Sequence, residues 1–149
     1  MIFDIMFGME SNIIIGTALN KHARFYLGDT TKLVDDAGKI HDMWPTSLAA
    51  LGRTMAVTSV MALMQKNEGE SVTTTINGGG SIGTVLATAD SEGNVKGFVG
   101  NNHLYLKYNE SNKLAVGLVV GTEGHLKVIR DLKMRNSYTT QVALRTGEI

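Results

Sequence analysis

Residues 45–65 of the 149-residue chain, PTSLAALGRTMAVTSVMALMQ, carry the clearest structural signal in the sequence. Pro45 has the fixed φ angle and the missing N–H group that suit the first turn of a helix. Arg53 is the single formal charge in the segment, and apolar side chains surround most of the helical circumference. Such a helix is either buried on several sides or spans a membrane. Because Arg53 and several Thr and Ser residues interrupt the run, we expect a buried central helix rather than a membrane span.

Small and sulfur-containing residues indicate how this helix packs. Ala49, Gly52 and Ala56 form a stripe of small side chains, which predicts that another element approaches the helix closely. The chain has eight methionines, and methionine suits an adaptable binding surface. We interpret three of them as core residues of this helix instead: Met55, Met61 and Met64.

The segment before residue 45 predicts a hairpin and a short helix. The apolar runs Ile13–Ala18 and Ala23–Leu27 flank the turn Leu19-Asn20-Lys21-His22, as in a β-hairpin. A helix that begins near Thr30 or Thr31 would then align four apolar residues along one side. These residues are Leu33, Val34, Ala37 and Ile40.

After residue 70 the apolar pattern changes from helical to alternating, in short runs separated by turn sequences rich in Gly, Asn and Ser. Six runs predict strands: Ser71–Ile76, Ile82–Ala89, Val95–Val99, Leu104–Tyr108, Leu114–Val120 and Leu126–Ile129. Connections this short join antiparallel neighbours. The predicted fold class is α+β, with antiparallel β-sheets packed around a long buried central helix.

Composition excludes several functional classes. Fourteen basic and fourteen acidic residues give zero net charge, which argues against nucleic acid and anionic membranes as partners. The chain has no cysteine, so it can form no disulfide or cysteine-ligated metal site. The four histidines lack a metal-ligand spacing, and the apolar N-terminus, MIFDIMFGME, has no basic lead-in or cleavage site typical of a signal peptide. We therefore expect a cytoplasmic protein.

The glycine-rich segment GGGSIG, residues 78–83, matches two functional motifs. As G-x-G-x-x-G it would open a helix that binds a dinucleotide, but a strand-like run follows, and Asp90 comes too early for the ribose contact. As G-x-S-x-G it would be a hydrolase elbow, with Ser81, Asp90 and His103 in serine hydrolase order. The elbow also requires a following helix. A small-molecule hydrolase or ligand-binding module that uses Gly78–Gly83 is the alternative function.

Four strings of residues carry a family resemblance: HDMWPTSLAALGRT at 41–54, GGGSIG at 78–83, GTEG at 121–124 and TGEI at 146–149. In these strings, in their order and in their spacing, the chain resembles the redox-regulated holdase chaperones of the heat shock protein 33 family, from about Glu10 to the last residue. The resemblance implies an ATP-independent bacterial chaperone that binds unfolding client proteins under oxidative or heat stress and acts as a homodimer.

The resemblance also implies a division of the chain. Residues 10–149 would form the N-terminal core domain, and residues 1–9 a leader or extension, with Met9 as a possible native start. The family's regulatory zinc site uses C-terminal cysteines that form disulfides on oxidation, and this chain contains none of them. The chain is therefore expected to bind no cofactor and to lack the switch. It would act either as a client-binding core or as a dimerisation scaffold only.

We expect structural roles for the matched residues, and we assign no catalytic, metal-binding or client-binding residue. Arg53 in an apolar helix should pair with a carboxylate, either Glu123 or Glu148. Trp44 should anchor the core ahead of Pro45, and the glycines should serve backbone geometry. The structural motif residues are Trp44, Pro45, Thr46, Gly52, Arg53, Gly78, Gly79, Gly80, Gly83, Gly121, Glu123, Gly124 and Glu148.

Overall fold

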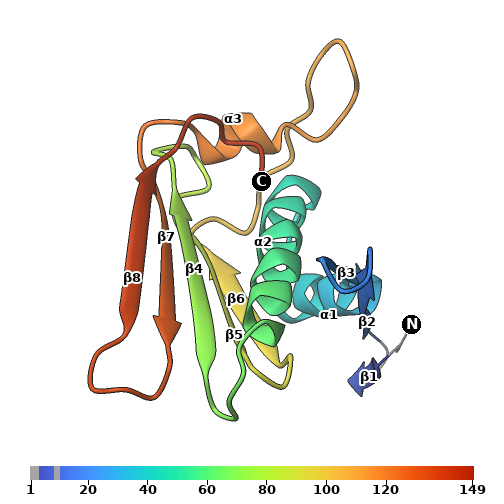
Figure 1. Cartoon of the computed structure of the whole chain (residues 1–149). Coiled ribbons are helices and arrows are strands. Elements are labelled where there is room, and N and C mark those ends of the chain that lie inside the picture. The colour runs from blue at the N-terminus through green and yellow to red at the C-terminus, as the bar shows by residue number, and fades with distance from the viewer. Residues whose placement is uncertain (1–3, 9–10) are drawn as a thin grey trace.

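The computed structural model describes residues 4–8 and 11–149, which fold into two antiparallel sheets and three helices (Figure 1). One sheet has the strand order β1-β2-β3, and the other has the order β6-β5-β4-β7-β8. The strands are β1 (Asp4–Gly8), β2 (Ser11–Ala18), β3 (Ala23–Asp29), β4 (Ser71–Asn77), β5 (Val85–Asp90), β6 (Val95–Val99), β7 (His125–Asp131) and β8 (Tyr138–Ala143). The helices are α1 (Thr31–Ile40), α2 (Pro45–Leu63) and α3 (Val116–Val120). The α+β class with antiparallel sheets is confirmed.

Helix α2 forms the centre of the fold and begins at Pro45, as predicted. It packs on β5, β6 and β4, and it also contacts α1, α3 and β3. Leu51 and Met55 of α2 are buried against Val85 and Ala87 of β5. One side of the helix remains open, because 53% of Val57 is exposed and Arg53 is also exposed. The helix is therefore buried on several sides, as expected, and open to solvent on one.

Length and composition alone would let α2 cross a membrane, and it is the one helix among the described residues of which this is true. More than half of its apolar window, 56%, is nevertheless buried inside the protein. A core helix of a water-soluble protein meets the same length and composition criteria. The packing of α2 on the five-stranded sheet is that of a core helix.

The N-terminal hairpin and helix lie where the sequence predicts them. Strands β2 and β3 pair around the turn at residues 19–22, and α1 follows. Helix α1 approaches α2 at the small-residue stripe, where Gly52 is buried and an added Cβ would lie 2.8 Å from the methyl groups of Val34. Ile40 is an exception, because it is 78% exposed at the end of α1 rather than packed with Ala37. The predicted leader at residues 1–9 falls partly outside the described residues, and Asp4–Gly8 pairs with β2.

Two of the six strands predicted after residue 70 are wrong, and strands β1 and β8 were not predicted. Residues 114–120 contain the short helix α3, whose Val116, Val119 and Val120 are buried. Residues 104–108 form an irregular segment joined to Leu114 by a single bridge at Lys107. The remaining four runs lie in β4, β5, β6 and β7, although β5 begins only at Val85. Strand β8 is additional, and its polar sequence, YTTQVA, lacks the apolar alternation of a half-buried strand.

The five-stranded sheet extends beyond the helix that covers it. Val72, Thr74 and Ile76 of β4 are buried on the face that carries α2. On the same face α2 covers β4, β5 and β6, whereas β7 and β8 project to one side of it (Figure 1). Every residue of β8 is exposed. Part of the sheet's apolar face is therefore left open to solvent.

Candidate functional site

The glycine loop is filled by the backbone of another part of the chain. Gly80 N–H and Ile82 N–H donate to the carbonyls of Val120 and Val119 at 3.0 Å. An added Cβ at Gly80 would lie 2.2 Å from the Val119 carbonyl oxygen, and one at Gly78 would lie 2.3 Å from that of Gly121. Contacts this close to backbone atoms exclude any side chain. The loop therefore packs against the end of α3 and offers no open phosphate cradle.

The second glycine motif meets the first across this contact. Glu123 N–H donates to Gly78 O at 2.9 Å, and an added Cβ at Gly124 would lie 1.9 Å from Asn77 O. Gly79, Gly83 and Gly121 have positive φ angles of +76°, +71° and +79°, which favour glycine. The matched glycines thus gather at one end of the five-stranded sheet, where two loops pack backbone to backbone.

The three groups of the hydrolase motif do not assemble. Ser81 is exposed at the glycine loop. Asp90 lies at the far end of β5, where its carboxylate accepts hydrogen bonds from the backbone of Glu92 and from Asn94 in its own turn. His103 Nε2 lies 3.2 Å from Asp42 Oδ2 instead. Without a base near Ser81, the geometry of a nucleophile elbow is missing.

The residues around the start of α2 hold a loop in place. Thr46 and Ser47 are fully buried, and their hydroxyls bind the backbone of the 101–106 segment. Trp44 is 51% exposed and contacts His103, with 5.3 Å between ring centroids. The expectation that Trp44 anchors the core is therefore wrong. It occupies the N-cap position, from which its N–H donates to Asn102 O at the surface.

Arg53 has the carboxylate partner that the sequence predicts. Its Nη1 lies 3.7 Å from Oε2 of Glu148 and donates to the carbonyl of Ile149 at 3.2 Å. Glu148 Oε1 accepts a 2.6 Å hydrogen bond from the Tyr108 hydroxyl. This hydrogen bond, together with burial, raises the pKa of Tyr108. The alternative partner, Glu123, lies at the glycine contact, and the Arg53 pair is about half exposed rather than buried.

An apolar groove lies beside this pair, between α2 and the uncovered part of the sheet. Its volume is about 370 Å³. Val57 and Met61 line it from α2, Leu126 and Val128 from β7, and Val142 from β8. The C-terminal segment adds Leu144 and Ile149 to the lining. Sequence reasoning missed the groove because residues from three distant segments form it, and no local pattern marks such an assembly.

The floor of the groove contains one polar group without a partner. Thr74 is 4% exposed, and its hydroxyl is one of two buried side-chain oxygens without a hydrogen bond among the described residues. An unsatisfied buried hydroxyl costs free energy. The groove is therefore a mostly apolar surface with a few polar groups, as binding sites commonly are.

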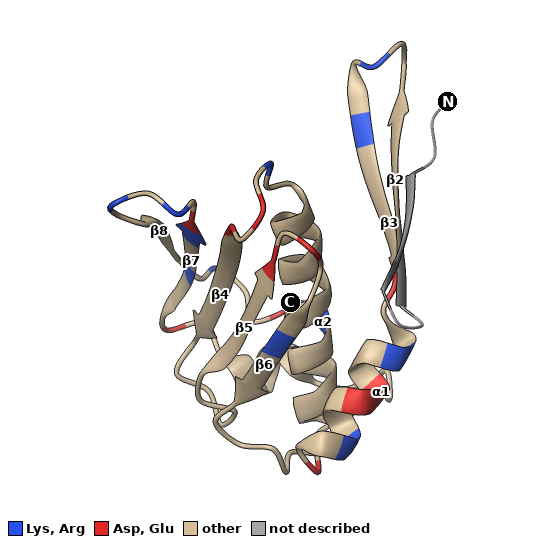
Figure 2. Ribbon diagram, turned by 90° about the horizontal axis from the view of Figure 1, so that it is seen from below, with Lys and Arg blue, Asp and Glu red and all other residues tan. Residues whose placement is uncertain are grey.

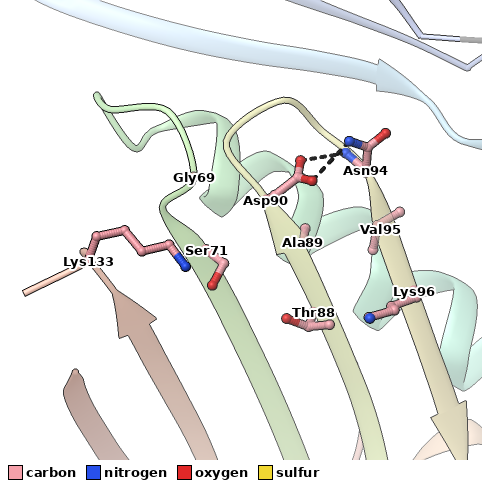
Figure 3. Close-up of a pocket in the computed structure, with 9 residues that line it drawn as sticks. All are labelled: Gly69, Ser71, Thr88, Ala89, Asp90, Asn94, Val95, Lys96 and Lys133. Atoms are coloured by element: carbon pink, nitrogen blue, oxygen red, sulfur yellow. Dashed lines mark hydrogen bonds between the residues drawn. The ribbon is translucent and has the colours of Figure 1, made fainter. Parts of the chain in front are cut away.

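A second hollow, of about 510 Å³, opens on the other face of the sheet (Figure 3). Ser71, Thr88, Lys96 and Lys133 line it together with Asp90. Burial raises the pKa of Asp90, but the hydrogen bonds from Asn94 and neighbouring amides outweigh that effect and lower it. Since the Asp90 carboxylate already accepts hydrogen bonds within its own turn, it is not available as a free acid or base in the hollow. Across the described ranges, no group of three His, Cys, Asp or Glu residues could hold a metal ion.

With this geometry established, comparison with known proteins identifies the family. The sequence profile described as Hsp33 protein matches residues 11–149. The chain belongs to the Hsp33 family. It is 45% identical over 141 residues to a protein of Alkaliphilus metalliredigens named 33 kDa chaperonin, and 42% identical over 141 residues to one of Clostridioides difficile with the same name. Each alignment covers 95% of this chain and 48% of the relative.

The structural comparison agrees for this Hsp33 chain. The crystal structure of the 33 kDa chaperonin from Thermotoga maritima matches it with a TM-score of 0.86 and 31% identity. The match covers 92% of this chain and 47% of the Thermotoga chain. The chain therefore spans about half the length of the relatives and has the fold of that half.

Proposed function

We propose that this chain is the client-binding core of an ATP-independent holdase chaperone. It would capture unfolding proteins under heat or oxidative stress and prevent their aggregation. The proposal is supported by family membership and by the name, 33 kDa chaperonin, that its relatives carry. The observation that carries it is the open apolar groove between α2 and β7–β8, because a holdase needs accessible apolar surface that non-native chains can share.

The groove suits varied clients better than a single ligand. Apolar side chains form most of its wall, and Met61 can adjust its shape to different partners. Val57 and Val142 are 53% and 51% exposed at its two sides, so a client segment can reach both the helix and the sheet. Binding would remove these side chains from water, which is the main driving force for association of apolar surfaces.

No catalytic step enters the proposal, since the relatives are named as chaperonins and Ser81, Asp90 and His103 lie apart. The test is Ser81→Ala. We expect unchanged suppression of client aggregation, because Ser81 is an exposed loop residue. Loss of the protein's activity in this variant, with the fold intact, would instead favour the hydrolase.

The residues of this chain cannot form the zinc site by which the family is regulated. The chain has no cysteine, and its described residues contain no metal-binding cluster, so they do not fit a zinc ion. The proposed binding step therefore uses no metal. The cytoplasm as its location and the homodimer as its assembly are further parts of the proposal.

Light scattering from an unfolding client protein, with this chain present under reducing conditions, tests the proposed function. We expect the wild-type chain to suppress scattering at near-stoichiometric ratios. Val57→Asp should weaken suppression, because it places a charge in the groove wall. The matched control is Phe98→Asp, since Phe98 is 47% exposed but pairs with Leu86 on the opposite face of the sheet. No suppression by the folded wild-type chain would contradict the proposal and leave a scaffold role.

A further inference from the structure

Strand β8 ends the five-stranded sheet with an unprotected edge. Leu144 N–H donates to Gly124 O at 2.9 Å, in register with the β7–β8 pairs. This bond shows which residues of β8 direct their backbone groups toward β7. Because antiparallel residues alternate between paired and unpaired positions, Thr139, Gln141 and Ala143 direct their backbone N–H and C=O groups away from β7. Among the described strands none lies on that side of β8. These groups are available to another extended chain.

Natural proteins usually block such an edge with charged residues, proline, glycine bulges or a covering element. Strand β8 has none of these within its sequence, YTTQVA, which is rich in residues that favour strands. The opposite edge strand of the same sheet, β6, contains Lys96 and Gly97 in its centre. The lack of protection is therefore specific to β8.

The free edge continues into the apolar groove. Val142 pairs with Leu126, and Leu126 pairs with the buried Ile76, so all three side chains lie on the face of the sheet that carries α2. A strand added beside β8 would place every second side chain on this same face. Its alternate apolar residues would extend the surface that Val142 and Leu126 begin.

Charge distinguishes between possible occupants. Residues 125–145, which contain the β7–β8 hairpin, carry five basic residues and one acidic residue, whereas Glu123 and Glu148 lie just outside this stretch (Figure 2). The six are Lys127, Arg130, Lys133, Arg135, Arg145 and Asp131. A second copy of the chain would bring an equally basic hairpin to the edge, and the like charges would repel. An extended segment with acidic residues at its ends would instead be attracted.

From these observations we propose that β8 captures clients by β-strand addition. The occupant is an extended, non-native polypeptide segment with alternating apolar residues and acidic flanks. Backbone hydrogen bonds to Thr139, Gln141 and Ala143 provide affinity for any sequence, while the groove favours apolar side chains. This inference rests on the proposed function and adds to it where and how the client binds.

The first test uses a fluorescent eight-residue peptide with alternating valines and acidic ends, followed by anisotropy with the wild-type chain. One version carries N-methyl groups on its two central amides, which blocks both edges of the peptide. The control carries them on its two terminal amides. We expect central methylation to weaken binding by about tenfold and terminal methylation to have little effect. Equal binding of the two versions, or no binding of the unmethylated peptide, would overturn strand addition.

The second test changes the protein. Gln141→Pro removes an outward N–H without removing a β7–β8 hydrogen bond, which an edge strand tolerates. With the fold checked by circular dichroism, we expect the same loss of peptide binding. If this variant fails to fold, the methylated peptides decide alone. If it instead converts a dimer to a monomer in sedimentation, a second copy occupies the edge and the proposal is wrong.

Light scattering distinguishes failure of the edge site on β8 from failure of the holdase function. Peptide binding by a wild-type chain that does not suppress client aggregation would support the edge site and contradict the holdase function. Suppression that Gln141→Pro leaves unchanged would overturn the edge site and leave the holdase function standing.

Discussion

Arg53 of α2 and Glu148 of the C-terminal segment form an ion pair across 3.7 Å, beside the apolar groove. Each side chain is about half exposed, at 46% and 49%. The pair joins the central helix to the C-terminal segment, which also lines the groove. The Tyr108 hydroxyl, in the loop before α3, donates a hydrogen bond to the same carboxylate.

Because solvent screens an ion pair this exposed, its contribution to stability should be small. We predict a coupling energy below about 1 kcal/mol in a double-mutant cycle with Arg53→Met and Glu148→Gln. Urea unfolding of the four proteins measures it. A coupling of several kcal/mol would mean that the pair behaves as a buried one, as the sequence alone suggested.

Gly80→Val should prevent stable folding. The new side chain would begin 2.2 Å from a backbone carbonyl, which cannot move as the end of a flexible side chain can. We expect a loss of several kcal/mol in the free energy of unfolding, seen as insoluble expression or a much lower melting temperature. Gly28→Val is the control, since Gly28 is exposed in β3. Equal stability of the two variants would contradict the assignment of Gly80 to backbone geometry.

Glu70 should contribute to acid unfolding. It is 4% exposed, and a 2.6 Å hydrogen bond from the Asn67 side chain, opposed by burial and aided by backbone amides, lowers its pKa. A carboxyl whose folded-state pKa is lowered stabilises the protein above its unfolded pKa of about 4.3, and this stability is lost as the pH falls through the folded value.

Glu70→Gln should therefore reduce the dependence of stability on pH below about 4.5, with a urea midpoint that already lies lower at pH 7. Urea midpoints at pH 7 and pH 3 measure the effect. Glu110→Gln, at an exposed turn residue, is the control. An unchanged pH dependence in Glu70→Gln would show that this carboxylate is not a source of acid sensitivity.

The elements that the sequence predicts well are those with long or repeated local signals. Pro45 and the apolar run after it specify α2, and turn sequences bound β4, β6 and β7. The run at 114–120 is different, because a short apolar segment does not distinguish a strand from a buried helix. In the helix that forms there, the carbonyls of Val119 and Val120 accept hydrogen bonds from the glycine loop. Residues 104–106 bind the hydroxyls of Thr46 and Ser47 rather than a neighbouring strand.

The candidate site was less accessible from sequence than the fold. A carboxylate partner for Arg53 could be predicted because an arginine in an apolar helix requires one, and the matched strings at 121–124 and 146–149 offered Glu123 and Glu148. The groove could not be predicted, since Val57, Leu126 and Val142 meet only after the sheet forms. Strand β8 could not be predicted for a related reason. It lies exposed at the edge of the sheet, and its sequence lacks the apolar alternation by which a strand is recognised.

Photo-cross-linking tests most directly whether the groove binds clients. A photoreactive amino acid at position 57, in the groove wall, is compared with the same residue at position 98, on the opposite face of the sheet. Each protein is irradiated with an unfolding client under reducing conditions. We predict strong cross-links to the client from position 57 and few from position 98. Equal cross-linking from both positions, or cross-linking from position 98 alone, would contradict client binding in the groove.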